Sequence, residues 1–346
     1  MRRTGSVHYI YASVIAPLPG VLADHGGNVD RPFRESGVPI ELAAAPERVL
    51  PMRGYLSLLE AAAWETGDEL FGVSLAERMN IDDLGPFGRL LTSAPTLRRA
   101  IETCNVLVQS YSPALRSWLD IEGETARWHY QVTGIRDCRE GRRLDCEQTL
   151  FLFRTLVRLA AGSTWQPSEF LLDQATPQQL RVFQRRLGAP ARSVGTDYAL
   201  VFPRDLLDLP MTYAKQLGRM ERQTLLTQFI STAPEGSFAA SVKEIVRGQL
   251  CAGYPEISGV ARSTGLSVRT FQRRLAEDGM AYSDLVADVR RDLAREMLAD
   301  PSRSQLDITL SLGYSDAANF SRAFKQWTGV APSEFRRSML PSPATV

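Results

Sequence analysis

Two short stretches near the C-terminal end of the chain repeat apolar residues with the period of an α-helix. The stretches are residues 267–275 and 319–327. Their apolar rows are Phe271 and Leu275 in the first stretch, and Phe320, Phe324 and Trp327 in the second. Side chains three or four positions apart share one face of a helix, so each row is expected to pack inward. The spacing therefore predicts two short amphipathic helices.

A glycine-centred turn and a shorter helical segment precede each of these helices. The shorter segments cover residues 256–263 and 307–312, and the turns cover 264–266 and 313–314. Two helices joined by a short turn form a helix-turn-helix, whose second helix enters the major groove of DNA. Two such units in tandem predict a DNA-binding module.

The outward faces of the two longer helices carry side chains that can recognise bases. An arginine can bind guanine, and a glutamine or asparagine can bind adenine, through paired hydrogen bonds in the major groove. The outward rows are Arg269, Gln272, Arg273 and Ala276 on the first helix and Ala318, Asn319, Arg322 and Gln326 on the second. Ser267 and Ser315 stand where N-caps are expected, and the helix N-termini are candidate phosphate sites.

A solvated helix face is the alternative interpretation of these arginines, because arginine is abundant along the whole chain. The distribution is more informative than the number. Residues 257–276 hold four arginines and no acidic residue. Residues 238–338 carry 14 basic and 12 acidic residues, a net charge of only +2. DNA affinity is therefore expected to depend on placed contacts rather than on bulk charge.

The run from Gly265 to Leu275 and the run from Leu312-Gly-Tyr-Ser-Asp to Glu334-Phe-Arg336 resemble the DNA-binding domain of the AraC/XylS transcription regulators. The second run matches the signature of that family nearly from end to end. The resemblance implies two helix-turn-helix subdomains joined by a long helix at about 283–298. It also implies that the base contacts come from Arg269, Gln272, Arg273, Ala317, Ala318, Asn319 and Arg322.

Two departures from the family pattern matter. Thr309 stands where a small alanine is usual in the second positioning helix, and we expect it to be harmless to packing. Ala317 and Ala318 replace residues that are often polar. The second reading helix is therefore expected to specify fewer bases than the first.

The first 230 residues change pattern near their middle. Helical spacing recurs through residues 20–110, and stretches at 115–121 and 125–132 flank Glu122-Gly123-Glu124, which predicts a β-hairpin. Further helices are predicted at about 146–161, 177–187 and 205–229, and further strands at about 170–173 and 193–202. The prediction is an α+β domain with a helical first half and a small sheet in the second half. An all-α domain follows.

The runs at residues 37–42, 58–72 and 85–99 resemble the "arabinose-binding-type" N-terminal domain of a subset of AraC-like regulators. That subset includes regulators of ornithine utilisation and of virulence or quorum control. The resemblance implies effector sensing, dimerisation or both, and does not establish a sugar ligand. The predicted organisation is an effector-sensing or dimerisation domain at 1–230, a linker at 231–237, the DNA-binding domain at 238–338 and a tail at 339–346.

A candidate effector pocket lies where the helical half meets the sheet. Trp128, Tyr130 and Val132 alternate on one strand face, and Arg154 lies on the following helix. An aromatic wall with one cation would suit an apolar carboxylate or a ring-bearing effector. The alternative is that Trp128 and Tyr130 belong to the core and that Arg154 is exposed.

The residues give no sign of an enzyme, a metal site or a cofactor. The three histidines are scattered, the four cysteines lack C-x-x-C spacing, and no phosphate-binding or nucleophile motif occurs. DNA-repair alkyltransferases also carry AraC-type helix-turn-helix domains. They need a zinc-bound cysteine or a Pro-Cys-His-Arg site, and none of Cys104, Cys138, Cys146 and Cys251 stands in such a sequence.

The sequence therefore predicts a sequence-specific, DNA-binding transcription regulator that responds to an effector through its N-terminal domain. The alternative is a regulator whose N-terminal domain only dimerises or binds a partner. Expected partners are double-stranded DNA, RNA polymerase, a small molecule and a second copy of the chain. Prolines interrupt the apolar stretch 7–22, which argues against a signal peptide, and no run predicts a membrane span. We expect a cytoplasmic location, where a DNA-binding domain can act.

Overall fold

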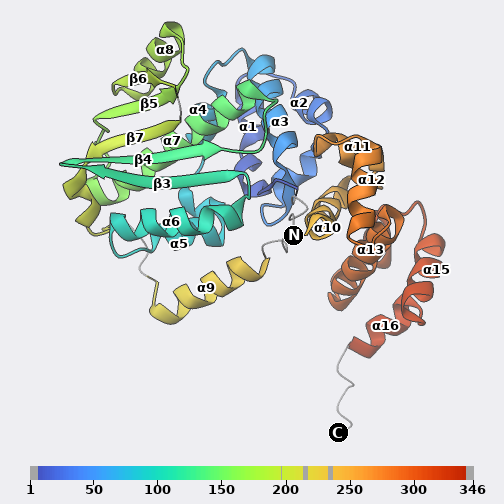
Figure 1. Cartoon of the computed structure of the whole chain (residues 1–346). Helices are drawn as coiled ribbons and strands as arrows, with labels where there is room; N and C mark the ends of the chain where they lie inside the picture. Colours follow the sequence, from blue (N-terminus) through green and yellow to red (C-terminus); the bar gives the residue numbers. More distant parts are fainter. Residues whose placement is uncertain (1–6, 196, 213–216, 233–236, 340–346) are drawn as a thin grey trace. The chain divides into compact units, whose positions relative to one another are not determined.

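The computed structural model describes residues 7–195, 197–212, 217–232 and 237–339 (Figure 1). These residues form two compact units, and the chain divides between Pro234 and Glu235. The expected linker at 231–237 and the expected tail at 339–346 lie partly outside the described residues.

The first half of the N-terminal unit is helical, as the sequence predicted. Its helices are α1 (Leu18–Asp24), α2 (Asp30–Ser36), α3 (Met52–Thr66), α4 (Phe71–Ala76), α5 (Pro86–Thr92) and α6 (Leu97–Tyr111), with 3-10 helices η1 (Ala12–Ile15), η2 (Ile40–Ala44) and η3 (Ile81–Leu84). In α6 the Thr96 hydroxyl caps the first turn by accepting from the amide of Arg99, and Ala100, Ile101 and Cys104 form part of the buried stripe.

One feature of this half was not predicted. Strand β1 (Tyr9–Tyr11) pairs antiparallel with β2 (Val49–Pro51), with Ile10 opposite Leu50. All residues of both strands are buried. Strands of three buried residues show no alternation of apolar and polar positions, so periodicity cannot separate them from neighbouring helices.

The second half of the unit carries a five-stranded sheet in the order β3-β4-β7-β5-β6. The strands are β3 (Leu115–Glu122), β4 (Thr125–Val132), β5 (Glu169–Asp173), β6 (Ala191–Val194) and β7 (Tyr198–Pro203). β3 and β4 form the predicted hairpin, with Ser117 opposite Tyr130 and Leu119 opposite Trp128. β5 and β6 run parallel, and the other pairs are antiparallel. Helix α8 (Pro177–Leu187) connects β5 to β6.

Helix α7 (Arg139–Ala161) joins the helical half to the sheet, packing on α3 and α4 as well as on β4 and β7 (Figure 1). It begins seven residues before the predicted start at residue 146, because its first turns are polar in sequence yet lie against α3 and α4. Two glycines permit this approach. A Cβ on Gly72 would lie 2.0 Å from a carbonyl oxygen of α7, and one on Gly141 would lie 2.2 Å from a carbonyl oxygen of α3.

Helix α9 (Arg219–Thr232) ends the unit. The sequence predicted one helix over 205–229, and this prediction was wrong at its start. The chain forms the 3-10 helix η4 (Arg204–Asp208), after which Pro210 pairs with Thr96 in extended conformation. Proline cannot donate the backbone hydrogen bond that a continuing helix needs. Residues 213–216 lie outside the described residues.

The described part of the C-terminal unit is all-α, as predicted. Its helices are α10 (Phe238–Gln249), η5 (Leu250–Ala252), α11 (Ile257–Ser263), α12 (Val268–Glu277), α13 (Tyr282–Ala299), α14 (Gln305–Ser311), α15 (Ala317–Thr328) and α16 (Pro332–Met339). α13 is the predicted linking helix, and it packs against α10, α14, α15 and α16. Its buried residues include Leu285, Val289 and Leu293.

Candidate functional site

The first helix-turn-helix consists of α11, a turn at Gly265 and α12. Gly265 has φ +76°, a left-handed conformation that glycine adopts without strain. The Ser267 hydroxyl caps α12 by accepting from the amide of Thr270 at 3.3 Å, as predicted. Phe271 and Leu275 are fully buried, which fixes the rotation of α12 about its axis.

The outward face of α12 presents Arg269, Gln272 and Arg273, all exposed. Arg273 forms an ion pair with Glu277 one turn later. An exposed pair of this kind is worth at most about 1 kcal/mol. A bidentate contact between arginine and guanine contributes about 1–3 kcal/mol to discrimination. The ion pair is therefore no obstacle to a base contact by Arg273.

The second helix-turn-helix consists of α14, a turn at Gly313 and α15. The N-cap prediction was wrong here, because Asp316 and not Ser315 caps α15. The Asp316 carboxylate accepts from the amide of Asn319 at 2.7 Å, and Ser315 donates to Asp316. In both reading helices the cap stands four residues before the first buried phenylalanine. One additional residue separates turn from helix in the second unit, and it moves the cap from Ser315 to Asp316.

The apolar row of α15 packs inward as predicted. Phe320 and Phe324 are fully buried, and Trp327 is half-buried with its ring 6.4 Å from that of Tyr314. The Phe324 ring meets Phe335 of α16 edge-on at 5.4 Å. The second reading helix is therefore anchored as firmly as the first.

The outward face of α15 offers fewer free polar groups. Ala317 and Ala318 are exposed and end in methyl groups. The Asn319 side chain donates to Asp316, and the Arg322 guanidinium donates to the Asn319 side-chain oxygen. The backbone amide of Asn319 also donates to Asp316. This hydrogen bond is the main reason that the pKa of the Asp316 carboxyl lies below its usual value. The polar groups on this face are thus bonded mainly to one another.

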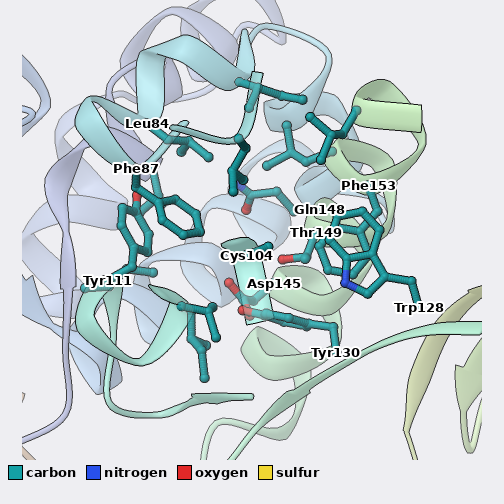
Figure 2. Close-up of a pocket in the computed structure, with 18 of the residues that line it drawn as sticks. Leu84, Phe87, Cys104, Tyr111, Trp128, Tyr130, Asp145, Gln148, Thr149 and Phe153 are labelled. Atoms are coloured by element: carbon teal, nitrogen blue, oxygen red, sulfur yellow. The ribbon is translucent and has the colours of Figure 1, made fainter. Parts of the chain in front are cut away.

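A cavity of about 70 Å³ lies between α5, α6, α7 and β4 in the N-terminal unit (Figure 2). Two aromatic pairs form opposite walls. Phe87 and Tyr111 stack at 4.8 Å between ring centres, and Trp128 and Phe153 stack at 3.4 Å. Tyr130 lines the base of the cavity, so both aromatic residues predicted for the effector site face it. The indole nitrogen of Trp128 donates to Ser117 at 2.8 Å, which holds the ring in place.

Arg154 does not line this cavity, contrary to the expected aromatic wall with one cation. Its guanidinium donates to the carbonyl oxygen of Leu187 at 3.0 Å and lies over the Phe151 ring. Arg154 is only 6% exposed, so the exposed alternative was also wrong. Phe153, one residue earlier on α7, faces the cavity, and consecutive residues point about 100° apart on a helix. Burial lowers the pKa of Arg154 to about 10.

The charged residue that does line the cavity is Asp145, which sequence reasoning missed. It is 3% exposed and accepts from the Tyr130 hydroxyl at 2.9 Å. Burial raises the pKa of Asp145 to about 7, although the hydrogen bond from Tyr130 opposes the rise. Asp145 follows a run of arginines that looks solvated. Its spacing of four and eight residues from Thr149 and Phe153 was the signal available.

Helix α9 packs on the aromatic wall of the cavity. Phe229 is 2% exposed, and its ring centre lies 5.8 Å from Phe87 and 6.3 Å from Tyr11. Phe87 in turn stacks on Tyr111, and both line the cavity. Phe229 therefore joins the cavity wall to the last turn of the helix that leads toward the DNA-binding unit.

A second recess, of about 590 Å³, is polar and lies beside the start of α7. Arg139, Arg142 and Asp173 contribute to its lining. The Arg142 Nε and Asp173 Oδ1 atoms are buried there with no hydrogen-bond partner among the described residues. The recess therefore presents charge of both signs, in contrast to the apolar cavity.

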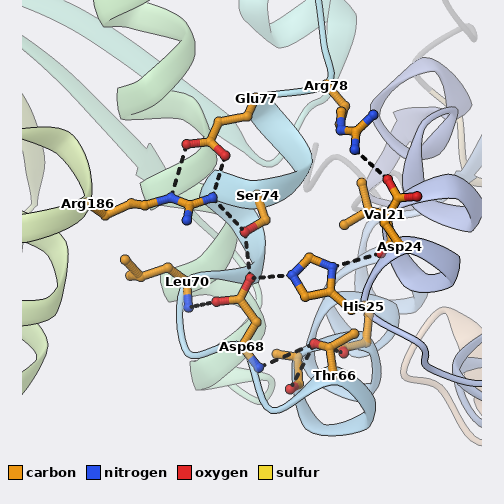
Figure 3. Close-up of polar contacts among 12 residues, drawn as sticks. Val21, Asp24, His25, Thr66, Asp68, Leu70, Ser74, Glu77, Arg78 and Arg186 are labelled. Atoms are coloured by element: carbon orange, nitrogen blue, oxygen red, sulfur yellow. Dashed lines mark hydrogen bonds and ion pairs between the residues drawn. The ribbon is translucent and has the colours of Figure 1, made fainter.

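His25, Asp68 and Ser74 lie together near the C-terminal end of α1 and the start of α4 (Figure 3). Ser74 donates to the Asp68 carboxylate at 2.5 Å, and His25 Nε2 lies 3.8 Å from the same carboxylate. A Ser-His-Asp triad needs the histidine between serine and aspartate. Here the aspartate is in the middle, and Arg186 of α8 also donates to Ser74. The cluster ties helices together and does not activate the serine.

Cys104 and Cys146 are buried free thiols, and burial raises the pKa of both. Within the described ranges, no group of three or more His, Cys, Asp or Glu residues is placed to hold a metal ion. The same ranges contain no helix that is long and apolar enough to cross a membrane.

Two family descriptions match the chain. Residues 26–211 match "Arabinose-binding domain of AraC transcription regulator, N-term", and residues 260–338 match "Helix-turn-helix domain". The HTH-type transcriptional regulator VirS of Mycobacterium tuberculosis is 26% identical over 313 residues, which cover 88% of this chain and 90% of that protein. The ornithine utilization regulator of Pseudomonas aeruginosa is 24% identical over 339 residues, 95% of each chain. A crystal structure of the transcriptional regulator CdpR from Pseudomonas aeruginosa aligns over 93% of this chain and 96% of that one, with 21% identity and a TM-score of 0.45.

Proposed function

The chain belongs to the AraC family of DNA-binding transcription regulators with an arabinose-binding-type N-terminal domain, and from this premise we propose that a small-molecule effector controls its binding to promoter DNA. α12 and α15 enter successive major grooves about 34 Å apart, roughly one turn of the duplex. The proposed base-contacting residues are Arg269, Gln272 and Arg273 on α12 and Ala317, Ala318, Asn319 and Arg322 on α15.

One observation carries the DNA-contact proposal. Three exposed hydrogen-bonding side chains share the face of α12 opposite the fully buried Phe271 and Leu275. A reading helix needs this arrangement, because the buried face holds the helix while the polar face reaches the base edges.

Selection of binding sites from random DNA tests the proposal with the full chain and its Gln272→Ala variant. We expect the variant to lose base preference at one position, at a cost of about 1–3 kcal/mol for the preferred site. Arg303→Ala, an exposed arginine in the loop between α13 and α14, is the control and should leave the selected sequence unchanged. A Gln272→Ala variant that selects the wild-type sequence would contradict the assigned face.

The effector is proposed to bind in the cavity walled by Trp128 and Tyr130. Arg154 stands behind this wall, where it fastens the end of α8 to α7. A ligand that shifts Phe87 or Tyr111 would change the packing of Phe229 and so the end of α9. The ligand then favours whichever of two arrangements of the DNA-binding unit it binds more tightly. The size of the shift is set by the difference between its two affinities.

The working form is proposed to be a homodimer in the cytoplasm that recruits or hinders RNA polymerase. Val106 on α6 and Met220 and Ile230 on α9 are exposed apolar side chains that would suit a contact between copies. A dimer raises the effective concentration of the second DNA-binding unit at a paired site. Sedimentation of the full chain, with Met220→Glu as the variant, should show a dimer that the substitution weakens. A monomer at micromolar concentration would contradict the dimer.

The alternative is an N-terminal unit that dimerises without sensing a ligand. Thermal-shift screening of the full chain against metabolites separates the two, because a ligand that binds only the folded state raises the melting temperature. Effector sensing also predicts that Val108→Phe, which projects a ring into the cavity, abolishes the shift.

A further inference from the structure

The described side chains that line the effector cavity include an acidic one and no basic one. Asp145 lines it, and no lysine, arginine or histidine is present among the described lining residues. The Tyr130 hydroxyl donates to the Asp145 carboxylate, but no positively charged side chain lines the cavity beside it among the described residues. A buried carboxylate without a counter-charge is costly. The described residues that line the cavity therefore do not supply the counter-charge that an ionised Asp145 would need.

The cavity walls add to the same preference. Six aromatic rings contribute to the lining, from Tyr55, Phe87, Tyr111, Trp128, Tyr130 and Phe153. The face of an aromatic ring carries negative partial charge, so an aromatic lining suits a cation better than an anion. A carboxylate would meet the negative charge of Asp145 unfavourably. With Asp145 on the wall in place of Arg154, the lining favours the ring-bearing effector over the apolar carboxylate, the two ligands that were expected.

A third observation concerns Gln148, which is 2% exposed and also lines the cavity. Its carbonyl oxygen accepts from the Tyr55 hydroxyl at 2.7 Å. Its amide nitrogen donates to the sulfur of Met79 at 3.3 Å, and a thioether is a weak acceptor. Asp145 and Gln148 lie three residues apart on α7, so an acceptor and an underused donor face the cavity side by side.

We propose that the cavity binds an organic ammonium, a ring-bearing molecule whose positive nitrogen pairs with Asp145 among the aromatic rings. The inference rests on the proposed function, since it names the chemical class of the effector. The cavity volume of about 70 Å³ is several times the roughly 10–15 Å³ that a single water requires. A cavity of about 150 Å³ holds a benzene ring, so a ring with a short amine chain enters only when the walls move apart, as a shift of Phe87 or Tyr111 would allow.

The proposal predicts a pH dependence in the wild-type protein. Because burial raises the pKa of Asp145 to about 7, the carboxyl is largely protonated at pH 6 and ionised at pH 8. An ammonium prefers the ionised form, so its affinity should rise about tenfold over this interval, where aliphatic amines stay protonated. The facing Tyr55, Tyr111, Tyr130 and Cys104 stay neutral there, because burial raises their pKa values.

Glu147 is the other carboxyl group on α7 whose pKa is raised, to about 7, by burial. It pairs with Arg143 and does not line the cavity. A variant at Asp145 separates its titration from that of Glu147.

The test uses the full chain and ring-bearing probes with matched ends. Benzylamine, 2-phenylethylamine and tyramine are compared with the alcohol and the carboxylate of the same skeleton, by thermal shift and calorimetry at pH 6, 7 and 8. We expect the amines to raise the melting temperature and to bind at least tenfold more tightly than the alcohols and carboxylates. Asp145→Asn should weaken amine binding at least tenfold and remove its pH dependence. Asp173→Asn, in the polar recess, is the matched control and should change neither.

Each other outcome overturns the ammonium proposal. Equal binding of amine and alcohol, with Val108→Phe blocking both, would retain the cavity as effector site and remove the role of charge. Carboxylate binding that survives Asp145→Asn would retain sensing with the opposite ligand charge. Absence of binding by all amines would reject this ligand class. Should Asp145→Asn not fold, a pH-independent amine affinity in the wild type would reject the pairing on its own.

Discussion

The two reading helices, α12 and α15, share the spacing of their cap and buried residues but differ in the residues on their outward faces. In α12 and α15 a cap residue is followed four positions later by a fully buried phenylalanine, and the next buried position lies four further on. Counting from the caps, Arg269 corresponds to Ala318, Gln272 to Ser321 and Arg273 to Arg322. The shared spacing orients both helices, and the differing outward positions support the proposal that the first helix makes most of the base-specific bonds.

The N-cap residues are a second difference between the two helices. Ser267 is neutral, whereas Asp316 places a carboxylate at the N-terminus of α15, where a phosphate would otherwise meet the free backbone amides. We infer that α12 dominates sequence recognition, while α15 mainly contributes shape and methyl contacts to the complex.

The largest expected effect tests the buried rows that the two helices share. Phe324→Ala should destabilise the second subdomain by about 3–5 kcal/mol, because it removes a fully buried ring. Phe271→Ala should cost the first subdomain a similar amount. Urea unfolding of the full chain, followed by circular dichroism, measures both. A variant that unfolds at the wild-type midpoint would show that the corresponding row faces solvent.

The next effect tests the unequal outward faces. Arg273→Ala should cost about 1–3 kcal/mol of specific affinity and relax base preference at one position. Arg322→Ala should cost less than about 1 kcal/mol, because we expect fewer base contacts from α15, where the outward Ala317 and Ala318 end in methyl groups. Gel-shift titrations at one fixed salt concentration compare the two. Equal losses would mean that the helices contribute equally.

Exchanging the caps is expected to give a smaller effect. Asp316→Ser should tighten DNA binding by about 0.3–1 kcal/mol while a hydroxyl still caps α15. Ser267→Asp should weaken it by a similar amount. Because the pKa of Asp316 lies below its usual value, its carboxylate is ionised at neutral pH, and the difference should be the same at pH 6 and pH 8. Fluorescence anisotropy with labelled DNA measures these changes, and effects of the opposite sign would mean that this helix end points away from the duplex.

The last comparison concerns the positioning helices, where Thr309→Ala is expected to have one of the smallest effects. Thr309 and Ala261 stand four residues before the turn glycines of their units, and both are buried. The Thr309 hydroxyl donates to the Gln305 carbonyl within the same helix, so Thr309→Ala should change stability by less than about 1 kcal/mol. Ala261→Thr should cost about 1–3 kcal/mol through overpacking. Thermal unfolding compares the pair, and a costly Thr309→Ala would show that the hydroxyl has a structural role.

The sequence was informative where local rules decide the structure. The period of Phe271 and Leu275, the cap at Ser267 and the turn glycines predict the first helix-turn-helix because each acts over a few residues. The cap at Asp316 was missed because Ser315 is equally suitable by type. Only the distance to Phe320 distinguishes them.

The effector cavity was predictable only in part, for a different reason. Alternation along β4 was sufficient to place Trp128 and Tyr130 on the buried face. The face of α7 that lines the cavity was not predictable, because α3 and α4 cover one part of the helix and the sheet covers another. Which charged residue faces the cavity, Asp145 or Arg154, depends on that tertiary packing and not on periodicity.

The position of Phe229 has a consequence for engineered chimaeras of this sensor. Phe229 lies on α9 yet packs against Phe87 and Tyr11, so it belongs to the core of the N-terminal unit rather than to a spacer. A fusion that joins this sensor to another DNA-binding unit should keep the chain through Thr232, the end of α9. A junction placed upstream of Phe229 would remove a ring from the sensor core and disconnect the readout from the site that it is meant to report.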